Sequence, residues 1–207
     1  MAARSILRLP GGEAVQVPEE LIDRLKRKDP AAYEEFLSLY GKQLLSFGFR
    51  MCGDTEDARE VVQETLLKTF ESIGDLKHSG AFKGWLYRIA TNACLMRRRR
   101  SKFLKEEITL DEALPGPART DPHWQRLPDE VVLGGEVKEK IREAILNLPD
   151  TYRSILILRD LEGLDTGETA TALSLSEDVV KMRLHRARAK IRNDLEAYFQ
   201  NGGRQAG

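Results

Sequence analysis

The chain has 207 residues, enough for one ordinary domain or two small ones, because single domains usually contain about 100 to 150 residues. Its 33 lysines and arginines are balanced by 33 aspartates and glutamates, so any argument for nucleic-acid binding depends on where the charges lie. Because its 2 cysteines and 3 histidines are widely spaced and no apolar run approaches the roughly 20 residues of a membrane span, we expect a soluble cytoplasmic protein with reduced thiols and without a metal or other cofactor.

The first block of predicted structure is helical from Asp29 onward. Asp29 is a candidate N-cap with Pro30 at the first helical position, and the helix that follows has an apolar stripe made of Phe36, Leu37, Tyr40, Leu44 and Phe47. A second helix starts near Thr55 or Asp57 and is closed by Gly74, with a stripe made of Ala58, Val61, Val62, Thr65, Leu66, Thr69, Phe70 and Ile73. A third helix covers residues 85–100, with an inward face made of Trp85, Leu86, Ile89, Ala90 and Ala93.

Between residues 106 and 135 this periodicity disappears, and a proline-containing, mainly acidic composition predicts a flexible linker. Trp124 is the exception within it, because a tether has little use for a large aromatic residue; it either docks onto a domain or is exposed by chance. We therefore expect an all-α protein of two small helical domains. The predicted boundaries are an N-terminal extension (1–28), a first domain (29–105), the linker (106–135), a second domain (136–199) and a tail (200–207).

The second block has the pattern of a helix-turn-helix. One helix covers residues 136–148 and another starts from Pro149 and ends at Gly163. A short helix, "TGETATAL", then precedes the turn "SLS" and a long charged helix with Ser176 as its N-cap. The elbow of the motif is predicted to be apolar, formed by Ala170, Leu173, Val180 and Leu184. Ala187 and Ile191 continue the same arc along the long helix.

The long helix carries six basic residues from Lys181 to Arg192 and no acidic residue among them. A charge run is ordinarily a solvated surface, but such surfaces mix signs to form i,i+4 pairs, so unopposed positive charge favours contact with a polyanion. Glu177 and Asp178 in the first turn suit the helix dipole and can accept a hydrogen bond from cytosine N4. We predict DNA contact by Ser176, Glu177, Asp178, Val179, Lys181, Arg183, His185, Arg186 and Arg188.

A second basic segment, "RRRRSKFLK" (97–105), follows the third helix of the first block. Basic residues beside Trp85, Tyr87 and Asn92 suit a strand whose bases have left the stack, although the spacing of Trp85 also fits a core position. The helix before it has an acidic outer face that DNA would avoid and that suits a protein partner or water. This face contains Asp57, Glu60, Gln63, Glu64 and Glu71.

The segments "GWLYRIATNACLMRRRR" and "LPDTYRSILILRDLEGLDTGETATALSLSEDVVKMRLHRARAKI" resemble bacterial sigma factors of the extracytoplasmic-function group. The similarity covers about residues 29–105 (region 2) and 136–199 (region 4). It implies a subunit without a catalytic site that binds core RNA polymerase, directs it to promoter DNA and helps melt it. Free members of the group are usually held by an anti-sigma factor.

The resemblance also implies roles for particular residues. Docking on the clamp of the largest polymerase subunits is implied for Asp57, Glu60, Gln63 and Glu64. Capture of an unpaired base of the minus-ten element is implied for residues 76–83 and Asn92, and reading of the minus-thirty-five element for the helix from Ser176. The set expected for minus-ten recognition and melting is Lys77, Lys83, Trp85, Tyr87, Arg88, Asn92, Met96, Arg97 and Arg98.

Three positions depart from the family pattern. Met96 stands where many relatives have Asp or Asn, which puts polar base contact there in question. Glu177 and Asp178 replace small or apolar residues, which predicts an altered minus-thirty-five preference.

Two other classes of protein compete with this interpretation. A dimeric helix-turn-helix regulator would use its first block as a sensor or dimerisation domain, yet it has no need of a second basic and aromatic segment. A helical scaffold would leave the unbalanced charges without a role. An enzyme is disfavoured, because no His, Cys or carboxylate cluster forms an acid–base or nucleophile arrangement.

Overall fold

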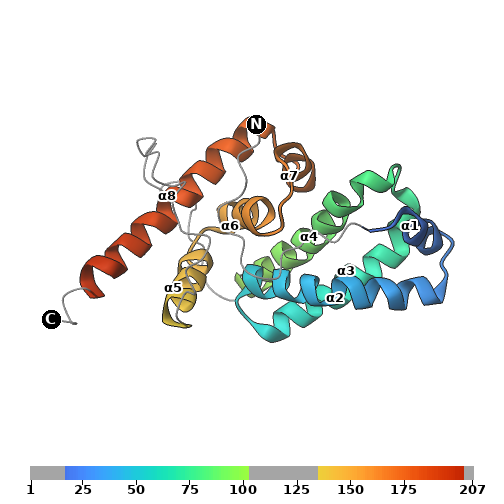
Figure 1. The fold of residues 1–207 in the computed structure, drawn as a ribbon, viewed down its shortest axis with the longest axis horizontal. Coiled ribbons are helices and arrows are strands. Elements are labelled where there is room, and N and C mark those ends of the chain that lie inside the picture. The colour runs from blue at the N-terminus through green and yellow to red at the C-terminus, as the bar shows by residue number, and fades with distance from the viewer. Residues whose placement is uncertain (1–16, 103–134, 203–207) are drawn as a thin grey trace.

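The computed structural model describes residues 17–102 and 135–202, and within these ranges it contains helices and no strands (Figure 1). The expected all-α class is therefore confirmed, and the expected linker, including Trp124, lies outside the described residues. The first domain comprises α1 (Glu19–Lys26), α2 (Pro30–Cys52), α3 (Thr55–Ser72), the 3₁₀ turns η1 (Ile73–Asp75) and η2 (Ser79–Ala81), and α4 (Phe82–Lys102). The second comprises α5 (Gly135–Leu146), α6 (Asp150–Leu156), the π-helical turn η4 (Ile157–Leu161), α7 (Thr166–Leu173) and α8 (Glu177–Gly202).

Local capping chemistry explains where α2 and α3 begin and end. The Asp29 carboxylate accepts a hydrogen bond from the Ala31 amide at 3.0 Å, as expected of the N-cap of α2. Gly53 ends α2 with φ +81°, a conformation that glycine adopts without strain. Asp54 then caps α3 by accepting from the amides of Glu56 and Asp57 at 2.8 and 2.9 Å.

Most of the predicted apolar stripes are buried, but the core assignment of Leu37 and Phe70 is wrong. Leu37 is 48% exposed because it lies at the margin of the α2 stripe. Phe70 is 41% exposed and packs at the surface, with its ring centroid 4.8 Å from that of Tyr33 and the Lys28 ammonium 5.3 Å away. On α3 the buried positions include Thr65, whose hydroxyl donates to the Val61 carbonyl at 2.6 Å.

Helix α1 was not predicted, although it belongs to the core of the first domain. Leu21, Ile22 and Leu25 are each no more than 1% exposed, and they pack in the same cluster as Phe36. Glu19 in the first turn and Lys26 in the last complement the helix dipole. The N-terminal extension therefore contributes structure to the first domain.

The second domain has the expected helix-turn-helix. Asp165 and Glu168 form a capping box that starts α7, and Ser174 ends it in the left-handed conformation with φ 55°. The chain then turns directly into α8, where the Ser176 hydroxyl oxygen accepts from the Val179 amide at 3.3 Å. Before α7, the π-helical turn η4 carries Asp160, whose carboxylate points towards α8.

The two domains pack against each other. Helix α4 contacts α7, and α2 contacts α5, α6 and η4, while α8 extends away from the first domain (Figure 1). Buried apolar residues of both domains form one continuous cluster. This packing decides which of the predicted site residues are accessible.

Candidate nucleic-acid interfaces

Helix α8 presents its first turns to solvent. The predicted apolar arc of Val180, Leu184, Ala187 and Ile191 is buried, with no member more than 7% exposed. The opposite side is exposed and is formed by Glu177, Asp178, Lys181, Met182 and His185. Val179, Arg183, Arg186 and Arg188 are intermediate in burial. One side of the helix is therefore packed against the domain, and the other side is free to enter a groove of a partner molecule.

The positive charge of α8 is partly opposed, contrary to the expectation from the sequence run alone. Arg188 donates two hydrogen bonds to Asp160, with Nε to Oδ2 at 2.9 Å, and Asp160 is only 5% exposed. Lys190 pairs with Asp194, and Lys181 Nζ lies 3.3 Å from Asp178. Asp178 and Asp194 are local neighbours that flank the run on α8, whereas Asp160 lies 28 positions away along the chain and could not be paired with Arg188 from the sequence pattern. Arg188 consequently has a structural role in holding α8 against η4.

Arg183 also has an internal contact, because its guanidinium lies 5.8 Å from the centroid of the Tyr152 ring. Among the described residues, Arg186 and His185 make no ion pair in the structure. His185 and Lys181 are exposed, and Arg186 is intermediate in burial.

A second surface is the outer stripe of α4, defined here as Trp85, Arg88, Asn92 and Met96. Helical spacing places these four residues on one side. Arg88, Asn92 and Met96 are exposed, and Trp85 is half-buried, with its ring centroid 5.9 Å from that of Phe82. Lys77 is exposed in the loop before α4. An aromatic face, an amide and cations are thus placed together, as an unpaired base requires.

Tyr87, which was expected among the DNA contacts, is covered by the second domain. It is 3% exposed, and its hydroxyl donates to Glu162, which also pairs with Arg50 of α2. Burial and the Glu162 carboxylate raise the pKa of Tyr87, so the hydroxyl stays protonated and able to donate. Lys83 lies on the same covered side, beside Gly163.

We expect Glu162→Gln to loosen the domain contact, because a charge-assisted hydrogen bond that is largely buried is replaced by neutral ones. Such bonds contribute about 1.5–3 kcal/mol, so the equilibrium constant for separation of the two domains should increase roughly 10- to 100-fold. Amide hydrogen exchange of α4 and α7 measures this directly. Glu139→Gln, which alters an exposed pair with Arg142, is the matched control. Unchanged protection in Glu162→Gln would show that this contact does not hold the domains together.

The arginines that follow the outer stripe are also engaged internally. Arg97 pairs with Asp57 at 2.5 Å and with Glu60, two members of the acidic face of α3. Arg98 pairs with Asp150 of the second domain at 2.8 Å and donates to the Met51 carbonyl at 3.1 Å. The basic segment therefore begins by joining structural elements rather than by facing solvent.

A fully buried arginine that the sequence analysis missed joins the two domains. Arg153 is 1% exposed and donates to the carbonyls of Met51 (2.8 Å), Ile145 (3.1 Å) and Leu148 (2.7 Å), and also to that of Leu146. It thereby satisfies the carbonyl end of α5 and attaches it to α2. Burial and the nearby Arg98 charge lower the pKa of Arg153 to about 10, which leaves it charged at neutral pH. In the sequence, the burial of Arg153 is indicated by its position as a lone charged residue within the apolar run "TYRSILIL".

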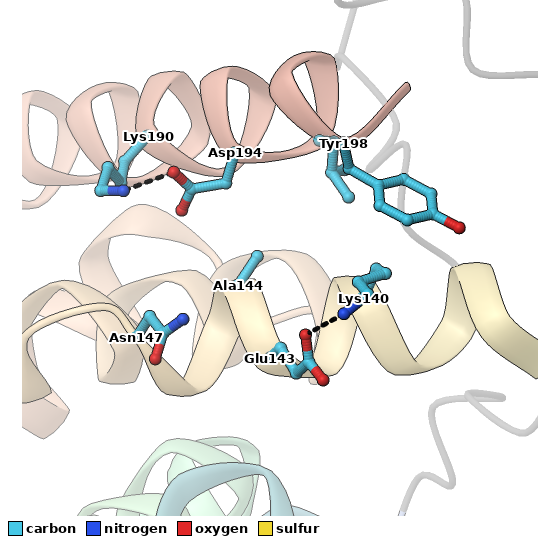
Figure 2. A pocket seen from close by; sticks show the side chains of 8 residues that line it. Lys140, Glu143, Ala144, Asn147, Lys190, Asp194 and Tyr198 are labelled. Atoms are coloured by element: carbon cyan, nitrogen blue, oxygen red, sulfur yellow. Dashed lines mark hydrogen bonds and ion pairs between the residues drawn. The ribbon is translucent and has the colours of Figure 1, made fainter. Parts of the chain in front are cut away.

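A shallow pocket of about 180 Å³ lies between α5 and the C-terminal half of α8 (Figure 2). Its charged side chains pair with one another, Lys140 with Glu143 at 2.8 Å and Lys190 with Asp194. These pairs make the pocket a charged groove between two packed helices. In the described residues no helix is long and apolar enough to span a membrane, and no cluster of metal-ligating side chains is present.

Comparison with known proteins gives these surfaces a context. Residues 36–103 match the family profile described as Sigma-70 region 2, and residues 138–191 match that of Sigma-70, region 4. The chain is 29% identical to the ECF RNA polymerase sigma factor SigW of Bacillus subtilis, over 84% of this chain and 94% of that protein. It is 28% identical to the RNA polymerase sigma-H factor of Pseudomonas aeruginosa, over 86% and 93% of the two chains.

Two solved structures share the fold. CnrH, in complex with the cytosolic domain of CnrY, superposes with a TM-score of 0.61 at 22% identity, covering 86% of this chain and 96% of that chain. The sigma factor RpoE from Bartonella quintana, in complex with the anti-sigma factor NepR, superposes with a TM-score of 0.59 at 19% identity, covering 79% and 96%.

With more than half of its length matched by the two regions, the chain belongs to the sigma-70 family of RNA polymerase sigma factors, in the extracytoplasmic-function group. It is a transcription initiation factor. The match of the first domain to region 2 also decides against the dimeric regulator, in which that block would be a sensor.

Proposed function

We propose that this sigma factor recognises promoters with two separate surfaces, the start of α8 and the outer stripe of α4. The observation that carries the proposal is that each domain leaves one helix side exposed with base-reading chemistry, while the remaining predicted residues are held in internal contacts. The exposed residues would touch DNA, and the internally bound ones would fix the position of their helices.

The start of α8 would read the minus-thirty-five element. Glu177 and Asp178 offer carboxylates that accept from cytosine N4 in the major groove, and Ser176 and Val179 lie beside them. Lys181 and His185 on one flank of the buried arc, and Arg186 on the other, would bind phosphates or base edges. Arg183 and Arg188 would position the helix through Tyr152 and Asp160.

The outer stripe of α4 would hold an unpaired base of the minus-ten element, with Lys77 following the phosphates. Flipping a base out of the stack costs a few kcal/mol, which stacking on Trp85 and hydrogen bonds from Asn92 would offset. Lys83 and Tyr87 lie under the second domain, so any base contact by them requires the two domains to separate. Arg97 and Arg98 would support the stripe through their ion pairs.

The acidic face of α3 would dock on core RNA polymerase. Gln63 and Glu60 are exposed and Glu64 pairs with Lys68 at 2.6 Å, whereas Asp57 and Glu60 share Arg97. The clamp of the largest subunits would compete with Arg97 and Lys68 for these carboxylates. We place the protein in the bacterial cytoplasm, where polymerase and promoters are, and assign it no catalytic role and no cofactor.

An anti-sigma factor is the second protein partner that we propose. CnrH and the Bartonella RpoE are both described in complexes, with the cytosolic domain of CnrY and with NepR respectively. A partner that stabilises the packed domains would keep the Tyr87 side of α4 covered and so prevent full promoter contact.

We expect Asn92→Ala to impair open-complex formation about 10-fold or more, because removing one base contact costs about 1–3 kcal/mol. Permanganate reactivity of unpaired thymines, with bacterial core polymerase and a recognised promoter, measures melting. The exposed control Asn193→Ala should melt the promoter like the wild type. On a premelted template, Asn92→Ala should still be less active than Asn193→Ala, since the captured base still lacks its partner. Equal melting by Asn92→Ala and wild type would contradict the proposed pocket.

A further inference from the structure

An exposed methionine lies in the middle of the α8 surface that faces away from the domain. Met182 is 45% exposed, and it is the only apolar residue among the exposed positions from Glu177 to Arg186, a stretch that the structure describes in full. At about 100° per residue, Met182 is almost diametrically opposite the buried arc of α8. Its side chain therefore projects from the side of the helix that is free to enter a groove.

Met182 has no packing role that would explain an apolar side chain at this position. It lies outside the buried apolar cluster that joins the two domains. Its neighbours one helical turn away on the exposed side are Asp178, His185 and Arg186, all polar or charged, and the Asp178 side chain is 95% exposed. Single exposed apolar residues are common on protein surfaces, so the exposure of Met182 assigns it no role by itself. Its place among base-reading groups does.

The major groove of DNA offers one apolar group to such a side chain, the C5-methyl of thymine. Carboxylates and cations gain little from a methyl group, whereas methionine is unbranched, polarizable and able to adapt its shape to one. We propose that Met182 packs on the C5-methyl of a thymine in the minus-thirty-five element, which rests on the reading role proposed for α8 and adds a particular base to it. Met182 is then a residue that determines promoter specificity.

The spacing along α8 limits where this thymine lies. Met182 follows Asp178 by four residues, which is about 6 Å along the helix axis. Consecutive bases of a DNA strand are about 3.4 Å apart along the duplex axis. The thymine therefore lies within about two base pairs of the cytosine whose amino group Asp178 accepts from.

The test removes the methyl group from the DNA and the methionine side chain from the protein, separately and together. The full chain is assembled with bacterial core polymerase, and its affinity for promoter duplex is measured with each thymine of the element replaced in turn by deoxyuridine, which pairs like thymine but lacks the methyl. We expect one thymine at which deoxyuridine weakens wild-type binding about 3- to 5-fold, the factor expected for burial of one methyl-sized group. Met182→Ala should bind the thymine and deoxyuridine promoters equally well.

Phe199→Ala is the matched control for loss of an exposed apolar side chain. Phe199 is 55% exposed on the same helix, but it lies about 26 Å further along the axis. This variant should keep the wild-type difference between thymine and deoxyuridine. Equal loss of affinity on deoxyuridine substitution in wild type and Met182→Ala, or no loss at any thymine within two base pairs of the cytosine that Asp178→Ala no longer selects, would overturn the role of Met182.

Two further results separate the role of Met182 from the proposed function of α8. If charge reversal at Lys181 and Arg186 abolishes selection of the minus-thirty-five element while deoxyuridine has no effect, α8 reads the promoter and only the thymine contact is refuted. If no promoter element responds to that charge reversal, the reading role of α8 and the thymine contact are both refuted.

Discussion

Replacing Arg153 with methionine is expected to lower the free energy of unfolding by about 3–5 kcal/mol, which makes it the most destabilising single change proposed for this protein. Arg153 is 1% exposed and its guanidinium satisfies carbonyls of α2 and of the end of α5. Methionine fills a similar volume but donates no hydrogen bond, so these buried carbonyls lose their partner. Urea denaturation followed by circular dichroism measures the loss.

The matched control is Arg59→Met on α3, where the side chain is 65% exposed and lies 3.7 Å from Glu56. Such a surface pair contributes little, so the free energy of unfolding should change by less than about 0.5 kcal/mol. If Arg153→Met were as stable as Arg59→Met, the contact between Arg153 and the Met51 carbonyl would not contribute to joining the domains.

The double charge reversal Lys181→Glu with Arg186→Glu is expected to reduce promoter binding by the holoenzyme about 100-fold or more. Each lost contact costs roughly 1–3 kcal/mol, and each new carboxylate also repels the phosphates. Lys181 is exposed, Arg186 is intermediate in burial, and neither belongs to the buried arc of α8, so the change leaves that arc intact. Binding to double-stranded promoter DNA at two salt concentrations measures the effect.

A second double variant separates DNA contact from general damage to the domain. Lys140→Glu with Lys42→Glu places the same charge change on α5 and α2, away from the start of α8. It should leave promoter affinity within a few-fold of wild type, and both double variants should still co-purify with core polymerase. Equal loss of affinity in the two variants would mean that overall charge, rather than the surface of α8, controls binding.

Helix boundaries were predictable wherever the signal was local. The Asp29–Pro30 start of α2 and the Ser176 start of α8 follow from side chains that hydrogen-bond or constrain their own backbone. The start of α4 was placed three residues too late, at Trp85, because glycines around it resemble a loop. In the structure Phe82 is 1% exposed, with its ring centroid 5.8 Å from that of Phe36, so tertiary packing decides the first turn.

Helix α1, which was not predicted, has an amphipathic pattern in its sequence. "PEELIDRLKRK" places Leu21, Ile22 and Leu25 on one side and acidic residues before basic ones, which is the pattern of a short amphipathic helix. Its burial could not be inferred, because that depends on the groove left by the other helices of the first domain.

The sequence indicated where the candidate surfaces lie, but it did not show which of their residues are exposed and which are paired within the protein. Periodicity showed which side of α8 is buried, and the structure confirmed it. The partners of Arg188, Arg97 and Tyr87 lie 28, 40 and 75 positions away along the chain, at Asp160, Asp57 and Glu162. No local pattern reports such pairs, so a residue that looks available to DNA can already be bound within the protein.

Run-off transcription with bacterial core polymerase over a library of promoters, with and without this chain, tests the account most directly. We predict transcripts that appear only when the chain is present and that come from promoters sharing two sequence elements. Asn92→Ala should weaken selection for one of these elements, and the charge reversal at Lys181 and Arg186 should weaken selection for the other. Transcripts that are the same with and without the chain, or that share no pair of elements, would contradict it.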